Sequence, residues 1–325
     1  MHILICNRAS VPVTTYGGTE RVIWDLGKKL VEQGHQVTFM VPEGSSCPFA
    51  KILPLNKTKD LASQIPQDVD IVHFQFDPGK DFDLDTPWLT THHGNSDLAL
   101  QLPFNTVFVS RNQALRHGSA SFVPNGLDWS SYGKVDLGPQ KNYFHFLGKA
   151  AWRVKNLTGA IDLCTKNKSQ LIVMGGKRFN IKSGLRFTWS RQVKFLGMVG
   201  GETKFEVLRH SKGLIFPVRW HEPFGLAVIE SLYFGSPIFA TPYGALPELV
   251  PQECGHLSAN SDEILNAMAL NTYSRQECHR RATEFFNADR MAQGYLEIYS
   301  RILDGECLNV KYPQMREPAW PLPWS

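Results

Sequence analysis

The chain has 325 residues, of which 42% are hydrophobic and 20% are charged, and its formal net charge is +4. These values are ordinary for a globular protein, and the length suits two domains of about 100–200 residues each. No run reaches the roughly 18 apolar residues that a membrane span needs, which excludes a membrane-spanning helix.

The first six residues have no basic region ahead of their apolar run, so we predict no signal peptide. Six scattered cysteines without a C-x-x-C pair argue against a zinc knuckle or a disulfide framework. A reducing, cytoplasmic location is therefore expected. Residues 1–140 carry 11 Lys and Arg against 14 Asp and Glu, whereas the remaining residues carry 23 against 16. This basic excess favours an anionic ligand in the second part, and the acidic first part argues against a broad lipid-binding surface there.

Strand and helix patterns alternate through the first part of the chain. An apolar run at 2–6 is followed by a loop, and an amphipathic helix opens at Gly17-Gly18 and ends near residue 33. Further strands are predicted at 36–41, 70–74, 88–92 and 106–110, a helix at 111–117 and a turn at 123–126. This alternation predicts a parallel sheet with helices on both faces.

A second round of the alternation begins near Tyr143. Strands are predicted at 144–147, 170–174, 193–196, 214–217 and 237–240, and helices at 156–166, 202–210, 224–234, 262–269 and 276–286. The fold class is therefore α/β, with two Rossmann-like domains facing a ligand cleft at the carboxyl ends of their strands. We predict an N-terminal domain at 1–138 and a C-terminal domain at 139–290. A closing helix and a proline-rich tail, 291–325, are expected to pack back on the N-terminal domain.

Glu222 and Glu230 form the most informative motif, an E-x7-E run. Pro223, a Phe-Gly pair and an apolar stretch follow the first acid, which predicts a loop that enters a buried helix. Glu222 would lie on the loop and Glu230 about a turn and a half into the helix. The free N–H groups of a helix N-terminus favour an anion, and carboxylates bind hydroxyls. The motif therefore suits a ligand with an anionic centre and hydroxyl-rich ends, as a sugar nucleotide has.

Two segments of the first part follow predicted strands. Gly17-Gly18 would let a phosphate approach the backbone at a helix N-terminus, although a flexible loop with a cap is the alternative. The absence of G-x-G-x-x-G there argues against a dinucleotide oxidoreductase. His92-His93-Gly94 ends a strand, where a histidine can bind a sugar or serve only the local structure.

Three cations, Lys149, Arg153 and Lys155, lie within seven residues after the strand at 144–147. A leaving diphosphate needs such charge in its transition state, whereas a solvated surface cluster is the alternative. The acidic run 81–85 lacks the glycine and the final glutamate of a calcium loop, so we expect no metal site. Basic and aromatic residues interleave over 178–194. A surface excursion is expected there, with weak peripheral membrane contact as the alternative.

Taken together, these segments resemble the family-4 retaining glycosyltransferases, or glycosyl transferases group 1, whose GT-B fold has two Rossmann-like domains. The resemblance runs from residue 1 to about 303 and rests on the order and spacing of several segments. These are 17–21, His93-Gly94, 123–128, 195–197, the E-x7-E run and 289–299.

The resemblance implies roles for individual residues. Lys149 and Lys155 match the paired basic positions that hold the donor's diphosphate. The family usually has Arg at the first of them, so Lys149 keeps the charge but loses bidentate geometry. Gly17 and Gly18 would contact the same phosphate, and the amides of Phe224, Gly225 and Leu226 would contact the sugar and the phosphate. Glu222 would bind hydroxyls of the transferred sugar, and His93 would support the sugar and the reacting face. Glu230 would bind the ribose, and Met198 and Val199 would contact the base.

The implied activity moves a sugar from a UDP-, GDP- or ADP-sugar to a hydroxyl of a sugar, glycolipid or other acceptor, with retention of anomeric configuration. No metal or other cofactor would be needed, because lysines and helix dipoles replace the cation. Such an enzyme would serve polysaccharide or glycoconjugate biosynthesis, without nucleic acid, in the cytoplasm or peripherally on the inner membrane face. A nucleotide-sugar epimerase and a non-catalytic nucleotide-sugar or carbohydrate-binding protein stay open. The loops at 11–16, 44–49 and 77–86 would select the acceptor, which the sequence does not identify.

Overall fold

The computed structural model describes residues 1–12, 17–180, 186–187 and 190–325. The described chain divides into two units, which we treat separately. Unit 1 comprises Met1–Asp128 and Phe286–Pro318, and unit 2 comprises Trp129–Phe285 and Ala319–Ser325. The first boundary predicted from the sequence, at 138, lies ten residues after the boundary between the units, and residues 319–325, expected on the N-terminal domain, belong to unit 2. The domain limits as a whole stay predictions. Most of the predicted acceptor loop at 11–16, together with Lys182 and Trp189 of the basic-aromatic segment, lies outside the described residues.

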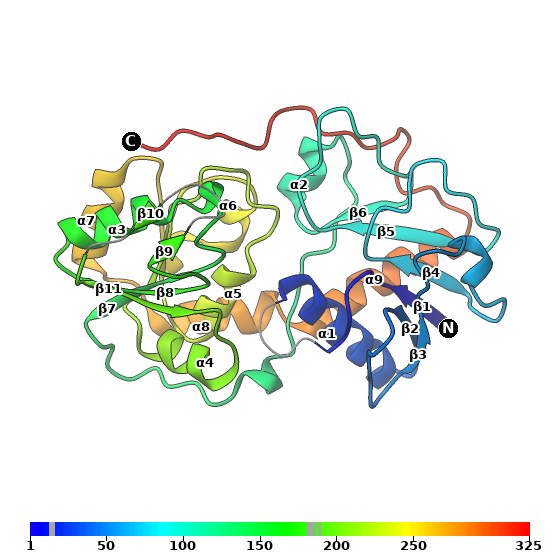
Figure 1. Cartoon of the computed structure of the whole chain (residues 1–325), viewed down its shortest axis with the longest axis horizontal. Coiled ribbons are helices and arrows are strands. Elements are labelled where there is room, and N and C mark those ends of the chain that lie inside the picture. The colour runs from blue at the N-terminus through cyan, green and yellow to red at the C-terminus, as the bar shows by residue number, and fades with distance from the viewer. Residues whose placement is uncertain (13–16, 181–185, 188–189) are drawn as a thin grey trace. The chain divides into compact units, whose positions relative to one another are not determined.

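Unit 1 is built on a six-stranded parallel sheet (Figure 1). Its spatial order is β3-β2-β1-β4-β5-β6. From β1 the chain adds β2 and β3 on one side of the sheet, and it then returns to the other side of β1 and adds β4, β5 and β6. The strands are β1 (His2–Cys6), β2 (Gln36–Val41), β3 (Lys51–Pro54), β4 (Ile71–Phe74), β5 (Trp88–His92) and β6 (Thr106–Phe108). Five of them were expected from their apolar runs, and the edge strand β3 was not.

The helices of unit 1 come from both ends of the chain. Helix α1 (Gly18–Glu32) buries Val22, Ile23, Leu26 and Leu30 at helical spacing, and it packs against α9 (Ala288–Leu303). The short helix α2 (Arg111–Arg116) lies beside β6 and is capped by the Ser110 hydroxyl, which accepts the Gln113 N–H. The 3-10 helix η1 (Ala62–Gln64) follows β3.

Unit 2 repeats the sheet of unit 1. Its spatial order is β11-β8-β7-β12-β13-β14, which is the same winding pattern when the strands are counted from β7. The strands are β7 (Tyr143–Leu147), β8 (Gln170–Met174), β11 (Val193–Gly197), β12 (Leu214–Phe216), β13 (Ile238–Ala240) and β14 (Gly255–Leu257), with a separate hairpin of β9 (Phe179–Asn180) and β10 (Arg186–Phe187). All described ladders of the six-stranded sheet are parallel.

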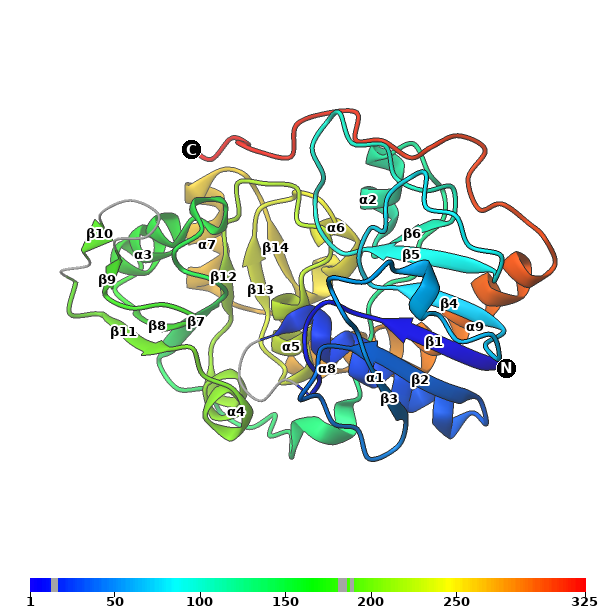
Figure 2. The same ribbon diagram turned by 45° about the vertical axis from the view of Figure 1, so that its right-hand side comes forward.

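Two groups of helices cover the sheet of unit 2 (Figure 2). Helices α3 (Leu157–Lys166) and α7 (Ser261–Leu270) pack together over a core in which Phe144 and Phe239 meet edge to face, with ring centroids 5.7 Å apart. Helices α5 (Leu226–Tyr233) and α8 (Arg275–Phe285) pack against each other. The remaining elements are α4 (Gly201–His210), α6 (Leu246–Leu249), η2 (Trp129–Tyr132), η3 (Arg153–Lys155) and η4 (Gln252–Cys254).

The winding pattern fixes where each sheet can bind a ligand. In parallel sheets of this order, ligands bind beyond the carboxyl ends of the strands where the winding direction reverses. The reversal lies between β1 and β4 in unit 1, and between β7 and β12 in unit 2. The residues that follow these four strands are therefore the first candidates for binding.

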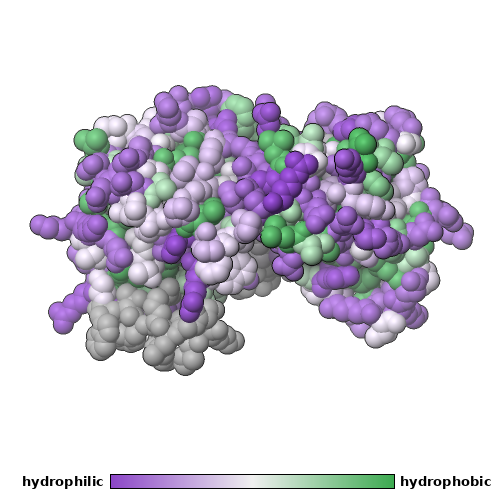
Figure 3. Space-filling model, turned by 90° about the horizontal axis from the view of Figure 1, so that it is seen from above, coloured by the Kyte–Doolittle hydropathy of each residue, from purple (hydrophilic) through white to green (hydrophobic). Residues whose placement is uncertain are grey.

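The described residues contain no helix that is both long and apolar enough to cross a bilayer. On the face drawn in Figure 3, hydrophobic side chains of the coloured residues are scattered among hydrophilic ones. All six cysteines are free thiols.

Asp25 is a buried carboxylate within α1. Its Oδ2 accepts the backbone N–H of Asp128 at 2.9 Å, and the Asp128 carboxylate is paired with Lys28 Nζ at 2.6 Å. Burial raises the pKa of Asp25 from 3.8 to about 6, while the Asp128 N–H acts in the opposite direction. The folded unit therefore binds the Asp25 proton more tightly than the unfolded chain does.

We expect the Asp25 contribution to the free energy of unfolding to fall as the pH rises from about 4 to about 6, because folding then forces a charged Asp25 into the interior. It is measured as the difference between wild type and Asp25→Asn, because His73, His92, His93 and His145, whose pKa values burial lowers, act in the opposite direction over this range. Asp25→Asn keeps an oxygen for the Asp128 N–H and removes the charge. It should stabilise the protein by about 2–3 kcal/mol at neutral pH relative to wild type, and this difference should vanish toward pH 4. Urea denaturation across this pH range measures both effects, with the exposed Asp83→Asn as the control. Parallel curves for wild type and Asp25→Asn would contradict the assignment.

Candidate functional site

A buried ion pair lies beyond the carboxyl ends of β7 and β12. Lys155 ends η3 after β7, and Glu222 lies on the loop after β12. Lys155 Nζ is 2.6 Å from Glu222 Oε2, and both residues are less than 10% exposed. The Trp220 indole N–H donates to the same carboxylate oxygen at 2.7 Å. The structure therefore brings together two of the residues that the sequence indicated, at the winding reversal of unit 2.

Two tryptophans line the cationic segment that follows β7. Lys149 Nζ lies 4.6 Å from the ring centroid of Trp152, and Lys155 Nζ lies 4.8 Å from that of Trp220. The two indoles meet edge to face, with centroids 6.2 Å apart. Each lysine thus lies over an aromatic face, which favours a cation at a defined position. The role of both lysines in holding a diphosphate stays a prediction.

Backbone contacts hold the loop that carries Glu222 in place. Gly244 forms a parallel bridge with Glu222, and the Ala245 N–H donates to the Glu222 carbonyl at 2.9 Å. Gly244 has φ 67°, and a Cβ on it would overlap the Glu222 backbone. Only glycine fits both requirements.

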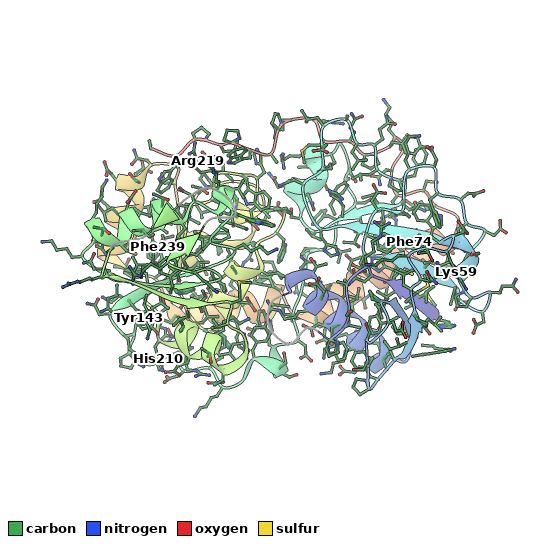
Figure 4. The ribbon with its side chains drawn as sticks, viewed as in Figure 1. Lys59, Phe74, Tyr143, His210, Arg219 and Phe239 are labelled. Atoms are coloured by element: carbon green, nitrogen blue, oxygen red, sulfur yellow. The ribbon has the colours of Figure 1, made fainter. Side chains whose placement is uncertain are left out.

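The end of the chain binds the same loop. The His221 N–H donates to the Ala319 carbonyl at 3.0 Å, and the Leu322 N–H donates to the Arg219 carbonyl at 2.8 Å. The Arg219 guanidinium, labelled in Figure 4, donates back to the Leu322 carbonyl at 3.0 Å. Residues 319–325 are therefore an ordered part of unit 2 that supports the Glu222 loop.

Helix α5 presents its N-terminus next to this loop. Gly225 precedes the helix with φ 110°, a conformation that favours glycine, and no side chain caps the helix among the described residues. Phe224 is buried beside it. The amides of Gly225 and Leu226 are thus part of a helix N-terminus, which attracts anions.

Glu230 lies inside α5, as the sequence predicts, and is 2% exposed. Its Oε1 accepts hydrogen bonds from Lys204 Nζ at 2.6 Å and from the Tyr132 hydroxyl at 2.7 Å. These partners neutralise and orient the carboxylate, and neither was predicted from the sequence. A bond between Glu230 and a ribose stays a prediction.

Met198 and Val199 follow the edge strand β11. Met198 is 45% exposed, and Val199 is half-buried. Their contact with a base is untested by the structure.

His93 follows β5 in unit 1 and bonds to the buried Gln75. Gln75 Oε1 lies 2.8 Å from His93 Nε2, and the Gln75 amide donates to His73 Nε2 at 3.0 Å. With the amide in this orientation, His93 carries its proton on Nε2, and His73 donates through Nδ1 to the Tyr299 hydroxyl at 2.7 Å. Burial lowers the pKa of His93 from 6.5 to about 4, so the ring is neutral at physiological pH.

Gly17 and Gly18 also belong to unit 1. Gly17 is buried immediately before α1, Gly18 is the first residue of the helix, and no side chain caps it within the described residues. The Gly17 carbonyl accepts a bond from Arg21 Nε at 3.2 Å. Because the two units are described separately, the juxtaposition of these glycines and His93 with the unit 2 residues stays a prediction.

Several partners of the candidate residues were not found from the sequence. In the sequence, Trp220 is one residue of a loop and Lys204 is one residue of an amphipathic helix, and neither stands out. Only the fold brings Trp220 to Glu222 and Lys204 to Glu230. Gln75 could have been suspected, because it directly follows a buried strand at the winding reversal. No group of three or more metal-binding side chains occurs among the residues for which the structure gives a description.

Comparison with known proteins agrees with this architecture. Residues 141–272 match the family described as Glycosyl transferases group 1. O-antigen chain mannosyltransferase C of Escherichia coli is 21% identical, over 90% of this chain and 96% of its own. A GDP-mannose-dependent α-(1-6)-phosphatidylinositol dimannoside mannosyltransferase of Mycobacterium tuberculosis is 35% identical over 81 residues, which are 23% of this chain and 21% of that protein.

Solved structures share the fold. AviGT4, a glycosyltransferase involved in avilamycin A biosynthesis, superposes with a TM-score of 0.74 and 22% identity, over 94% of this chain and 98% of its own. HepE of Anabaena in complex with UDP-glucose gives a TM-score of 0.66 and 15% identity, over 92% and 99%. The chain therefore has the GT-B fold of these glycosyltransferase structures, and residues 141–272 are similar to the Glycosyl transferases group 1 family.

Substituting Gly244 tests whether it fixes the Glu222 loop. Gly244→Ala should lose about 1–2 kcal/mol of unfolding free energy from its positive φ and about 1–3 kcal/mol more from the overlap with Glu222. The control is Gly201→Ala, which has φ 54° but no atom near the added Cβ, so it isolates the backbone contribution. Urea denaturation measures both variants. Equal losses would show that contact with Glu222 does not constrain Gly244.

Proposed function

We propose that this protein is a retaining glycosyltransferase of the family-4 type that transfers a sugar from a nucleoside-diphosphate sugar to an acceptor hydroxyl. The observation that carries the proposal is the buried Lys155–Glu222 ion pair at the winding reversal of unit 2. Glu222 lies in the loop that leads to α5, whose N-terminus has no side-chain cap among the described residues. The group 1 match over 141–272 and the GT-B fold support the same class of reaction.

The diphosphate of the donor would be neutralised by protein groups. Lys149, Lys155 and the N-terminal amides of α5 supply positive charge at this end of the sheet. In the buried ion pair Glu222 neutralises Lys155. An arriving diphosphate would replace Glu222 as the partner of Lys155 and leave the carboxylate to accept hydroxyls of the transferred sugar. The leaving group would then need no divalent cation, and transfer would be metal-independent.

Retention would follow from reaction on one face of the sugar. The leaving phosphate would accept the proton of the attacking hydroxyl, so no second carboxylate is required as nucleophile. The neutral His93 would serve as a hydrogen-bond partner of the sugar through Nδ1, because Gln75 holds the Nε2 proton. Glu230, held by Lys204 and Tyr132, would bind the ribose.

A nucleotide panel identifies the donor class. UDP, GDP and ADP are compared by thermal shift with and without EDTA, and GDP comes first because two mannosyltransferases are among the relatives. One nucleotide at 100 times its Kd should stabilise the protein by about 2.7 kcal/mol, equally in EDTA. Loss of the shift in EDTA would contradict metal independence, and no shift with any nucleotide would contradict the donor site.

Variants of the ion pair separate catalysis from folding. Lys155→Met should lower turnover by about 10²–10³-fold, because positive charge at the leaving group is lost, and Glu222→Gln should also impair turnover. Each single variant leaves one buried charge unpaired and should destabilise the protein by about 3–5 kcal/mol.

The double variant Lys155→Met with Glu222→Gln removes both charges. It should regain most of the lost stability while staying inactive, whereas the exposed Glu253→Gln should resemble wild type in both assays. Donor turnover and urea denaturation provide the two measurements. Full activity in the double variant would show that the pair is only structural.

Proton NMR of the first-formed product tests the stereochemistry. We expect the anomeric configuration of the donor to be kept, as the one-face mechanism requires. An inverted product would contradict that mechanism, and interconversion of the donor without an acceptor would instead indicate an epimerase.

A further inference from the structure

A cavity in unit 1 is lined by basic side chains, although residues 1–140 carry more acidic than basic residues. The cavity has a volume of about 260 Å³. Leu55, Leu61 and Phe76 give it apolar walls, and they belong to or pack against the core beneath the sheet. Three cations, Arg8, Lys57 and Lys59, and the amides of Asn56 and Gln64 form the rest of the lining, which contains no acidic residue.

The cavity occupies the position where a sheet of this order binds ligands. Cys6 at the end of β1 is in register with Phe74 at the end of β4, and these two strands flank the winding reversal. Arg8 and Phe76 each follow their strand by two residues. They therefore lie at the same level beyond the carboxyl ends of adjacent strands.

Arg8 is held in position by its neighbour. Its guanidinium carbon lies 4.1 Å from the centroid of the Phe76 ring. Stacking on an aromatic face restrains the guanidinium plane but leaves its N–H groups able to donate to an anion at the edge. The arginine thus offers a preorganised fork rather than a mobile surface charge.

The loop that carries both lysines is also fixed. The Gln64 amide Nε2 donates to the carbonyls of Asn56 and Lys59 at 3.0 and 3.3 Å, and Gln64 Oε1 accepts the Asn56 N–H at 2.9 Å. The Asn56 side chain in turn accepts from the N–H and the hydroxyl of Thr58 at 2.9 and 2.8 Å. One glutamine therefore organises the backbone that carries Lys57 and Lys59 (Lys59 is labelled in Figure 4).

The charged residues that line the cavity are all positive. Among the residues that the structure describes, no carboxylate lies within ion-pair distance of Arg8, Lys57 or Lys59. Three positive charges suit a phosphate monoester, which carries about −1.5 to −2 at neutral pH, better than a single carboxylate.

The cavity is linked to the candidate catalytic histidine. Phe76, in its wall, directly follows Gln75, whose side chain bonds to His93 at 2.8 Å. The Phe76 carbonyl accepts a bond from the Thr90 hydroxyl at 2.8 Å, which fixes it to the strand that leads to His93. Phe76 follows β4 and His93 follows the neighbouring β5, so a molecule anchored in the cavity would reach His93 along the shared carboxyl edge of these strands.

We propose that this cavity binds a phosphate group of the acceptor, with Arg8, Lys57 and Lys59 as its ligands and Gln64 as the residue that positions the lysines. The inference rests on the proposed glycosyltransferase function, because it assigns the acceptor to the class of phosphate-bearing glycans or glycolipids. The apolar walls would contact the part of the acceptor that adjoins the phosphate.

Calorimetric titration tests the site on the full chain, saturated with the nucleotide that stabilises it so that the donor site is occupied. The probes are glucose 6-phosphate, glucuronate and glucose, and, as a lipid source of a phosphate monoester, phosphatidic acid vesicles with phosphatidylcholine vesicles as reference. We expect a phosphate-bearing probe to bind wild type and to bind Arg8→Ala and the Lys57→Ala/Lys59→Ala pair about tenfold to a hundredfold more weakly. Preference for the soluble phosphate or for the anionic vesicles identifies the source.

Two further variants separate charge from position. Gln64→Ala keeps all three cations but releases their loop, so it should weaken phosphate binding and raise the acceptor KM more than it changes kcat. Lys51→Ala removes an exposed lysine from the start of β3, outside the cavity, and should bind phosphate as wild type does. Thermal melting checks that every variant is folded.

The inference is overturned if no phosphate-bearing probe binds wild type, if Arg8→Ala and the double lysine variant bind as tightly as wild type, or if glucuronate binds as well as glucose 6-phosphate. The nucleotide melting shift should persist in Arg8→Ala. If no nucleotide shifts the melting temperature of wild type, the proposed donor site is contradicted instead. The phosphate titrations would then be performed without nucleotide, so failure of the phosphate site and failure of the donor site remain distinct.

Discussion

Parallel strand pairing is the constraint on which the rest of this structure depends. Parallel strands end at the same edge of a sheet, and the chain must return over a face of the sheet before each new strand begins. Where the winding direction reverses, the return segments diverge and leave backbone and side chains exposed at the strand ends. Each unit has one such reversal, and the candidate residues gather there. Arg8 and Gln75 follow β1 and β4, and Lys149 and Glu222 follow β7 and β12.

Charge at these strand ends is handled differently in the two units. In unit 2 the carboxylates are buried and each is neutralised by a lysine, Glu222 by Lys155 and Glu230 by Lys204, both at 2.6 Å. Buried pairs of this kind contribute little net stability, because desolvation offsets their attraction, but a lone member would be costly. Their presence at a ligand-binding edge is consistent with partners that exchange when an anion arrives. In unit 1 the cations Arg8, Lys57 and Lys59 near Phe76 are exposed, and they form no ion pair with a carboxylate of the described residues. An anion that binds there therefore displaces no carboxylate.

Much of the fold could be predicted from the sequence, because buried parallel strands are continuous apolar runs bounded by turns. The runs at 2–6 and 36–41 coincide with β1 and β2, and Glu230 lies inside a helix as expected. The short edge elements escaped prediction for physical reasons. β3 is Lys-Ile-Leu-Pro with no fully buried residue, and β14 begins with a glycine, so neither shows the apolar run of a central strand. Helix α6 has only four residues, one of them proline.

The sequence by itself determined the α/β class, the order of the elements and the positions of Lys155, Glu222 and Glu230, since these depend on local patterns of apolar residues, turns and charge. Only the tertiary structure decided the partners. Lys204 and Tyr132 reach Glu230 from segments 26 and 98 residues away, and Gln75 lies 18 residues from His93. The proline-rich tail, which shows no regular pattern, is ordered because its backbone bonds to Arg219 and His221. Such contacts depend on how distant segments are brought together by the sheets, and no local pattern in the chain encodes them.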